Sequence, residues 1–267
     1  MTDSMYIDLT AEELYRRNIL LKRDREAGYN NEAFEEKLRP ILSEDKSIRA
    51  VTICFSDLEG KLHLLDYNKD FFLTSSDNLT FDGSSIKGFT DQNQSDLRLY
   101  PDWTSFRWIP SSIFGSGKVI LFGRVANQDG SDYENDLRTR LMRFLEALKR
   151  EKNTSVFAAP EIEGFLLEGI DAEQLYSETN VYRLATKGGY FSALPQDKLR
   201  LFIDTFAQAQ LMLGFENEKD HPEVAPSQFE LNYKYTDALT TADQIQLYKL
   251  VARQVAKSMG YTACFLP

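Results

Sequence analysis

Two glutamates near the middle of the chain have the spacing of a cation-binding pair. Glu161 and Glu163 lie two positions apart in the segment PEIEGF, and residues i and i+2 of a β-strand point to the same face. Neighbouring carboxylates repel each other unless a proton or a cation lies between them, and Mg²⁺ and Mn²⁺ take oxygen ligands. A solvated strand face has the same spacing, and taken alone the pair favours that simpler interpretation.

Two further glutamates lie in the proline-containing segment DHPEVAPSQFE. Glu223 and Glu230 are seven positions apart, which in a straight strand places them on opposite faces. Pro222 and Pro226 exclude a regular helix. The two carboxylates can therefore meet only if the chain turns between them, and Pro226 and Ser227 suit such a turn. A surface loop with incidental acids is the alternative, and the spacing alone favours it.

Two glycine-containing loops are further candidates for binding. FDGSSIKGF, residues 81–89, places Asp82 beside a glycine and two serines, and it is also explained as a simple turn. KGGYF, residues 187–191, could hold an anion on its glycine amides, but it lacks a phosphate-loop pattern. The sequence has no GxSxG segment, no Cys–His pairing and no zinc-ligand spacing, so nucleophilic catalysis has little support.

Residue patterns predict the elements that would position these side chains. Residues 1–47 are predicted to be helical, with a capping box of Thr10 and Glu13 and a helix stop at Gly28. Residues 48–132 are predicted to form a small β-rich domain. It begins with a hairpin of AVTICF and KLHLL and continues with the strands LRLY, FRWI and KVILFGRV.

After residue 132, helices and strands are predicted to alternate. The expected elements are a helix over 133–152, a strand over 155–167, a helix over 196–213, strands on both sides of DHPEVAPSQFE, a helix over 241–259 and a final strand at YTACFLP. The first helix carries an apolar stripe of Leu137, Leu141, Phe144 and Leu148. Thr241 and Gln244 are predicted to cap the last helix.

Composition argues against two classes of partner. The 267-residue chain has a net charge of −10, whereas nucleic acids and anionic membranes require a basic face. Neither a signal-peptide pattern nor an apolar run of membrane-spanning length is present. Both cysteines lie in apolar segments typical of buried thiols in a reducing compartment, so we expect a cytoplasmic protein. Because the sequence stops inside an apolar strand, we also expect the sheet to continue in a longer chain.

Six segments occur in the order in which one enzyme family has them. FDGSSIKGF, QSDLRLYPD, APEIEGFLL, KGGYF, HPEVAPSQFELNYKY and ADQIQLYKLVARQVAKSMGYTACFLP each resemble motifs of glutamine synthetase of the bacterial and archaeal type. The resemblance implies an α+β fold. A β-grasp-like domain would cover residues 48–132, and the first part of a catalytic α/β domain with a curved antiparallel sheet would cover residues 133–267. Residues 1–47 would form a helical N-terminal extension outside the resemblance.

The resemblance also implies a reaction and a set of site residues. The family joins ammonia to glutamate through a γ-glutamyl phosphate, with ATP as co-substrate and Mg²⁺ or Mn²⁺ in the site, and it works as a ring-shaped homo-oligomer. Metal ions in such a site neutralise the phosphoryl group as it moves. By motif, Glu163, Glu223 and Glu230 resemble ligands of one metal, Glu161 a ligand of a second, Glu218 a nucleotide-site acid, Tyr235 the aromatic that stacks on adenine, His221 a substrate-proximal histidine and Asp82 the ammonium-site aspartate.

Departures from the family pattern leave other functions open. Pro222 stands where many relatives have a second histidine, and Ser192 stands where an aspartate is usual. The family sequence also continues beyond this chain with the part that supplies the glutamate-binding loop. Two alternatives follow: a non-catalytic truncated paralogue that assembles with or regulates a full-length synthetase, and a sister ligase that joins glutamate to another amine. The intact FDGSS loop favours ammonia.

Overall fold

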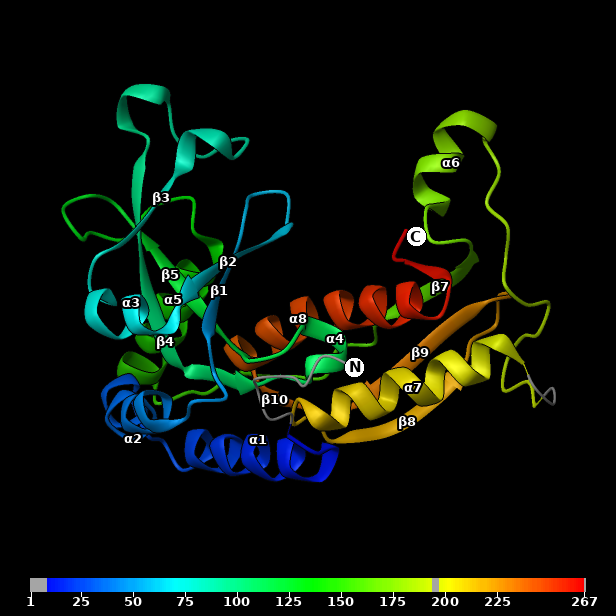
Figure 1. The fold of residues 1–267 in the computed structure, drawn as a ribbon, viewed down its shortest axis with the longest axis horizontal. Coiled ribbons are helices and arrows are strands. Elements are labelled where there is room, and N and C mark those ends of the chain that lie inside the picture. Colours follow the sequence, from blue (N-terminus) through cyan, green and yellow to red (C-terminus); the bar gives the residue numbers. More distant parts are fainter. Residues whose placement is uncertain (1–8, 194–196, 267) are drawn as a thin grey trace. The chain divides into compact units, whose positions relative to one another are not determined.

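The computed structural model describes residues 9–193 and 197–266, and the chain divides into two units. Unit 1 spans Met1–Val156 and unit 2 spans Phe157–Pro267. Figure 1 labels the elements of both units, which are described one at a time. Within the described ranges, no helix combines the length and the apolar character that crossing a membrane would require.

Unit 1 is built on a mixed five-stranded sheet with the strand order β2-β1-β5-β4-β3. β1 pairs with β2 as an antiparallel hairpin, which confirms the hairpin predicted from AVTICF and KLHLL, and it pairs with β5 in parallel. The strands are β1 Ala50–Ser56, β2 Leu62–Asn68, β3 Leu79–Asp82, β4 Asp96–Trp108 and β5 Lys118–Ala126. The helices are α1 Ala11–Glu26, α2 Asn31–Glu44, α3 Lys69–Ser75, α4 Ser111–Phe114 and α5 Leu137–Lys152, with short 3-10 turns at Gly83–Ser85 and Gln92–Gln94.

Strand β4 is longer than predicted. LRLY and FRWI, predicted as separate strands, belong to one strand whose register with β5 shifts between Asp102 and Arg107. Pro101 lies just before this irregularity, and Trp103 and Phe106 within it are buried. Pro101 is itself in register with Gly123 of β5, and the pairing of β4 with β3 ends at Leu99, so a residue that cannot donate a backbone hydrogen bond lies where β4 is the edge of the sheet.

The N-terminal helices α1 and α2 pack on β4. The Thr10 hydroxyl accepts a hydrogen bond from the Glu13 amide where α1 begins, and Gly28, at φ 86°, follows its end, so the predicted start and stop are confirmed. Asn18 in α1 is buried. Its side-chain amide donates to the Trp108 carbonyl at 2.7 Å and accepts from the Trp108 amide at 2.9 Å. Buried backbone groups need partners, and here a helix side chain supplies both.

Helix α5 forms in the predicted region but begins at Leu137 rather than at residue 133, and part of its apolar stripe is exposed. Its N-cap is Asp136, whose carboxylate accepts hydrogen bonds from the amides of Arg138 and Thr139. Leu137 and Phe144 of the predicted stripe are 46% and 59% exposed. The apolar spacing therefore predicted the helix but did not predict that these two side chains are exposed.

Unit 2 contains the antiparallel sheet predicted for the catalytic domain. Four strands follow the order β11-β7-β9-β8, and a separate two-stranded pair joins β10 to β6. The strands are β6 Phe157–Ala158, β7 Glu163–Glu168, β8 Asn217–Pro222, β9 Gln228–Tyr233, β10 Thr236–Asp237 and β11 Tyr261–Cys264. The helices are α6 Ala172–Thr179, α7 Lys198–Met212 and α8 Ala238–Ser258.

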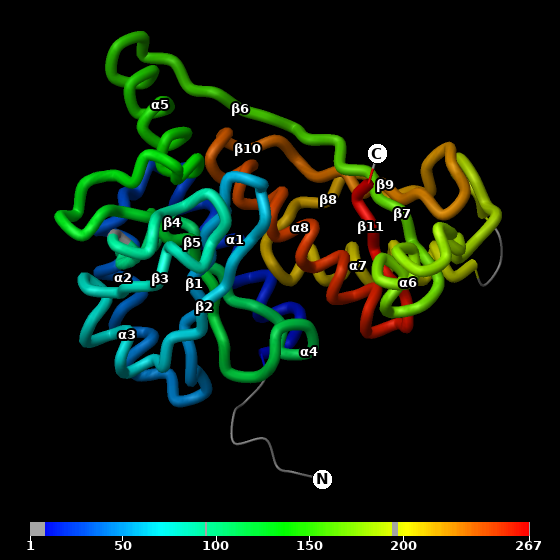
Figure 2. Tube along the Cα trace, turned by 90° about the horizontal axis from the view of Figure 1, so that it is seen from above, coloured from blue at the N-terminus to red at the C-terminus, as the bar shows by residue number. Residues whose placement is uncertain are grey.

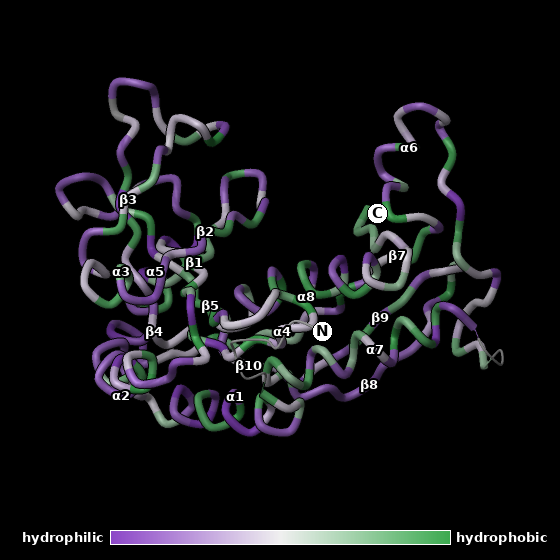
Figure 3. Tube along the Cα trace, viewed as in Figure 1, coloured by the Kyte–Doolittle hydropathy of each residue, from purple (hydrophilic) through white to green (hydrophobic). Residues whose placement is uncertain are grey.

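Helices α7 and α8 cover one face of this sheet (Figures 1 and 2). Both helices alternate between apolar and polar stretches along their turns, as Figure 3 shows. Phe229 of β9 is fully buried, with its ring centroid 4.9 Å from that of Phe202 in α7, and the Leu231 amide donates to the Tyr248 hydroxyl of α8 at 3.3 Å. Because strand residues alternate between faces, Glu230 must point to the opposite face.

Two predictions for unit 2 are wrong in detail. The strand expected over 155–167 is interrupted, because β6 pairs with β10 and the main sheet begins again only at Glu163. Helix α8 is capped by Asp237, whose carboxylate accepts from the Thr240 amide at 2.9 Å, and not by Thr241. Thr241 is buried inside the helix, where its hydroxyl donates to backbone carbonyls.

Candidate functional site

Three strands of unit 2 place two acidic side chains and a histidine next to one another. Glu163 of β7 faces Glu230 of β9, and Glu230 in turn faces His221 of β8. Residues directly opposite each other in a sheet share a face. The three side chains therefore form a row across the sheet, on the face away from α7 and α8.

The turn between β8 and β9 adds a fourth side chain. The Gln228 amide donates to the Ala225 carbonyl at 3.1 Å, which makes Pro226 and Ser227 the central residues of the turn, as the sequence predicted. The Glu223 amide donates to the Gln228 carbonyl at 2.8 Å. The chain therefore turns between Glu223 and Glu230, which their convergence requires.

His221, Glu223 and Glu230 form a cluster that could hold a cation. One potential ligand atom from each lies within 4.8 Å of the other two. His221 Nδ1 is 3.7 Å from Glu223 Oε1, and His221 Nε2 is 3.8 Å from Glu230 Oε2. Asn232 Nδ2 donates to Glu230 Oε1 at 2.7 Å and so fixes that buried carboxylate. Within the described part of the chain, the buried His221 Nε2 has no hydrogen-bond partner, which is uncommon for an interior nitrogen.

Glu163 extends this cluster toward β7. Its Oε2 accepts a hydrogen bond from Gln228 Nε2. Partial burial and the charges of the neighbouring glutamates, of which Glu223 contributes most, raise the pKa of Glu163. The negative charges of Glu223, Glu230 and Glu161 all act on Glu163, and a divalent cation would relieve this repulsion.

The KGGYF loop packs against the cluster. The rings of Tyr190 and Phe191 stack with centroids 3.8 Å apart, and both stand nearly perpendicular to the His221 imidazole. The Phe191 amide donates to the Pro222 carbonyl at 3.2 Å. The loop considered as a candidate anion site therefore packs two aromatic rings beside His221.

Ser227 links Thr186, the residue before this loop, to the turn between β8 and β9. Its buried hydroxyl accepts from the Thr186 amide at 2.8 Å and donates to the Thr186 carbonyl at 3.2 Å, although its backbone is in the left-handed region at φ 64°. We expect Ser227→Ala to be less stable than Ser227→Gly by about 1 kcal/mol, since both lose the hydroxyl but only glycine adopts this φ without strain. Hydrogen exchange should show faster exchange of the Thr186 amide in both variants. Equal or reversed stabilities in urea unfolding would contradict this account.

Glu161 lies just outside the strand that was predicted to carry it. It precedes β7, so the strand does not place it on the face of Glu163, although its charge still acts on Glu163. Glu161 instead lines a cavity of about 330 Å³ together with Glu218, Lys219 and Asn232. Two acids and one lysine in a small cavity can bind a cation and an anionic group side by side.

Two further predicted site residues have exposed side chains. The Tyr235 ring is 58% exposed and lies edge-on to Phe157, with ring centroids 5.9 Å apart. Asp82, in unit 1, accepts hydrogen bonds from the hydroxyls of Ser84 and Ser85 at 2.6 and 2.9 Å. These bonds, the Ser84 hydroxyl first, lower the pKa of Asp82, so its carboxylate is ionised at neutral pH.

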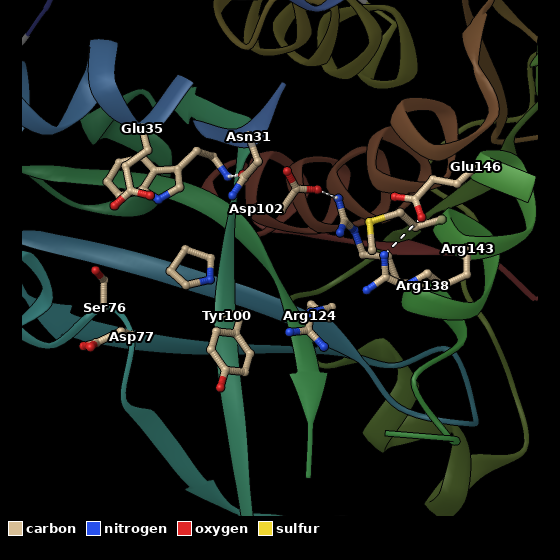
Figure 4. A pocket seen from close by; sticks show the side chains of 13 residues that line it. Asn31, Glu35, Ser76, Asp77, Tyr100, Asp102, Arg124, Arg138, Arg143 and Glu146 are labelled. Carbon is tan, nitrogen blue, oxygen red and sulfur yellow. Dashed lines mark hydrogen bonds and ion pairs between the residues drawn. The ribbon is translucent and has the colours of Figure 1, made fainter. Parts of the chain in front are cut away.

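Unit 1 also contains an arginine-rich cavity of about 450 Å³, drawn in Figure 4. Each of its three guanidiniums lies against a carboxylate, in the pairs Arg138–Asp102, Arg143–Glu146 and Arg124–Asp132. Because these charges are balanced within unit 1, the cavity has the character of a structural ion-pair network rather than of an anion site.

Comparisons with known proteins match both parts of the chain. A family model described as the glutamine synthetase β-grasp domain matches residues 47–127, and one described as the glutamine synthetase catalytic domain matches residues 134–267. The glutamine synthetase of Thermotoga maritima is 35% identical over 233 residues, which cover 87% of this chain and 52% of that protein. The chain belongs to the glutamine synthetase family. The Thermus thermophilus enzyme is 34% identical over 83% of this chain and 50% of its own length, so the chain spans about half the length of these relatives.

Solved structures share the fold. The cryo-EM structure of Plasmodium falciparum glutamine synthetase superimposes with a TM-score of 0.74 and 23% identity, over 87% of this chain and 50% of that one. A GmaS–ADP complex gives a TM-score of 0.72 and 24% identity, over 86% of this chain and 51% of that one. The resemblance to glutamine synthetase and the fold predicted from it are confirmed.

From the sequence, His221 was expected to lie near the substrate. Gln228 was given no role in this glutamine synthetase-family site. A two-residue loop at Pro226 and Ser227 would have placed Glu223 opposite Glu230. The observed loop has four residues, 224–227, and shifts the register by two, so that His221 faces Glu230 instead. A shift of two keeps every side chain on its face, and for this reason the acids still converge.

Proposed function

We propose that this chain supplies the divalent-metal half of a glutamate–ammonia ligase that proceeds through a γ-glutamyl phosphate. The observation that carries the proposal is the convergence of His221, Glu223 and Glu230 within 4.8 Å, with Glu163 facing Glu230 across the sheet. Under this proposal, Glu163, Glu223 and Glu230 hold one Mg²⁺ or Mn²⁺, and Glu161 contributes to a second.

The donor set fits such a cation. Carboxylate oxygens are the preferred ligands of Mg²⁺ and Mn²⁺, and Glu223 and Glu230 place like charges near Glu163. A bound cation would supply charge neutralisation on the ATP phosphates and on the carboxylate that accepts the phosphoryl group. Asn232 keeps one oxygen of Glu230 fixed, so the chain presents the site already formed.

The nucleotide is proposed to lie beside the cavity that Glu161 and Glu218 line. The exposed Tyr235 ring, held at its edge by Phe157, offers a flat face on which adenine could stack. His221, kept in place by the neighbouring aromatic rings, is proposed to contact ATP or glutamate.

Asp82 is proposed to hold ammonium. Its carboxylate is ionised and is fixed by two serine hydroxyls, which suits it to binding a small cation, although the lowered pKa makes it a weaker base. As in the family that the motifs resemble, we propose that this loop serves the site of a neighbouring subunit in a ring-shaped homo-oligomer. The proposed location is the cytoplasm, in keeping with two buried cysteine side chains.

The proposal is tested by calorimetric titration of the full 267-residue chain with Mn²⁺, followed by assay of ADP formation that depends on both glutamate and ammonium. We expect measurable Mn²⁺ binding that Glu223→Ala abolishes. Glu178→Ala, which removes an exposed acid of α6 in the same unit, serves as the matched control and should leave binding unchanged. Unchanged binding in Glu223→Ala would overturn the metal assignment, and preference for another amine over ammonium would overturn the substrate assignment.

A further inference from the structure

One uncharged side chain links the two acidic strands of the cluster. Gln228 lies opposite Phe165 of β7, two positions from the pair formed by Glu163 and Glu230, and therefore on the same face. Its Nε2 donates a hydrogen bond to Glu163 Oε2. Its Oε1 accepts one from the Ala225 amide at 3.2 Å. The side-chain amide thus spans from β7 to the tip of the turn.

The backbone of Gln228 reinforces the same connection. Its amide donates to the Ala225 carbonyl at 3.1 Å, and its carbonyl accepts from the Glu223 amide at 2.8 Å. One residue therefore fixes the carboxylate of Glu163, the tip of the turn and the backbone that carries Glu223.

An amide is the side chain that this position requires. A carboxylate here would place another negative charge within hydrogen-bond distance of Glu163 and next to Glu223 and Glu230. A lysine would supply a positive charge that competes with a metal ion. An amide donates to one oxygen of Glu163 without changing the charge of the cluster, and its own oxygen remains available to the turn.

We propose that Gln228 is a positioning residue that sets the separation between Glu163 and Glu223 so that both can bind one divalent cation. This inference rests on the proposed metal function. Outer hydrogen-bond partners of ligating groups typically change metal affinity by about 10- to 100-fold when they are removed. We therefore expect a loss of that size when the amide is replaced by an apolar chain of equal length.

The test compares Gln228→Met, which loses both hydrogen bonds, with Gln228→Glu, which keeps an acceptor for Ala225 but loses the donor to Glu163. Gln208→Met, on the exposed side of α7, is the matched control. Without metal, hydrogen exchange of the Ala225 amide should accelerate in the methionine variant only. With Mn²⁺, electron paramagnetic resonance titration should show affinity about 10- to 100-fold weaker in that variant, and an altered spectrum of the bound ion in the glutamate variant.

The two measurements separate the inference from the function on which it rests. If the wild-type chain binds no Mn²⁺, the metal function fails, whatever the exchange rates are. If the wild type binds Mn²⁺ and Gln228→Met binds it equally well with unchanged Ala225 exchange, the metal function stands and the positioning role is overturned. If Gln228→Met does not fold, Gln228→Glu decides the question, because an unchanged Mn²⁺ spectrum in that variant would overturn the link to Glu163.

Discussion

Glu230→Gln is expected to weaken Mn²⁺ binding severely while making the metal-free chain more stable. Glu230 is buried, lies between Glu163 and His221 in the row across the sheet, and is already oriented by Asn232. Glutamine keeps its shape and the acceptor for Asn232 but removes the charge that a divalent cation needs. We expect affinity for Mn²⁺ to fall at least about 100-fold, and stability without metal to rise by about 1 kcal/mol as like-charge repulsion is relieved.

The opposite signs of these two effects make the prediction specific. A purely structural role for Glu230 would lower both Mn²⁺ affinity and stability. Calorimetry would measure the first, and urea unfolding in the presence of a chelator, followed by far-ultraviolet circular dichroism, would measure the second. Glu178→Gln, on the exposed surface of α6, provides the control and should change neither. Wild-type Mn²⁺ affinity in Glu230→Gln would remove this residue from the metal site.

The turn at Pro226 and Ser227 shows how far sequence reasoning could reach. The odd spacing of Glu223 and Glu230, together with two prolines, was sufficient to require a turn between them, and the structure has it. What the spacing could not give was the length of the loop. Four loop residues rather than two change which side chain faces Glu230, and this depends on hydrogen bonds of the Gln228 backbone and side chain that no spacing rule specifies.

Other differences arise where contacts distant in sequence decide local structure. The strand predicted over 155–167 is interrupted because its first part pairs with β10, a partner almost eighty residues away. The same pairing explains why Thr241 does not cap its helix, since its hydroxyl donates to carbonyls of Ala158 and Thr236. Local propensity identified the residues that suit each element, and tertiary hydrogen bonds then set the element boundaries.

In unit 1, Arg138→Met is expected to cost about 3 to 5 kcal/mol of stability, because it leaves a buried carboxylate without its cation. Arg138 Nη2 is 2.7 Å from Asp102 Oδ2, and both side chains are largely buried (Figure 4). Burial alone would raise the pKa of Asp102, but Arg138 and the hydrogen bonds from Thr104 outweigh it, and the pKa is lowered. Replacing both partners, with Asp102→Leu and Arg138→Met together, should recover most of the loss.

The pH dependence distinguishes this ion pair from simple packing. A carboxyl whose pKa is lowered on folding contributes stability above its unfolded pKa, about 4, and that stability disappears as pH falls through the folded value. The deficit of Arg138→Met should therefore be largest near neutral pH and shrink on acidification. Both tryptophans, Trp103 and Trp108, are buried in unit 1, so urea unfolding followed by their fluorescence reports this unit alone. Arg150→Met, at an exposed position of the same helix, is the control.

A pH-independent deficit would mean that Arg138 acts through packing, for example against the Phe122 ring. The pH-dependent result would have a consequence for domain organisation. Asp102 lies in the stretch matched by the β-grasp model and Arg138 in the stretch matched by the catalytic-domain model, yet both belong to unit 1. A buried ion pair across that junction would explain why α5, which follows the boundary predicted at residue 132, folds with the β-grasp sheet.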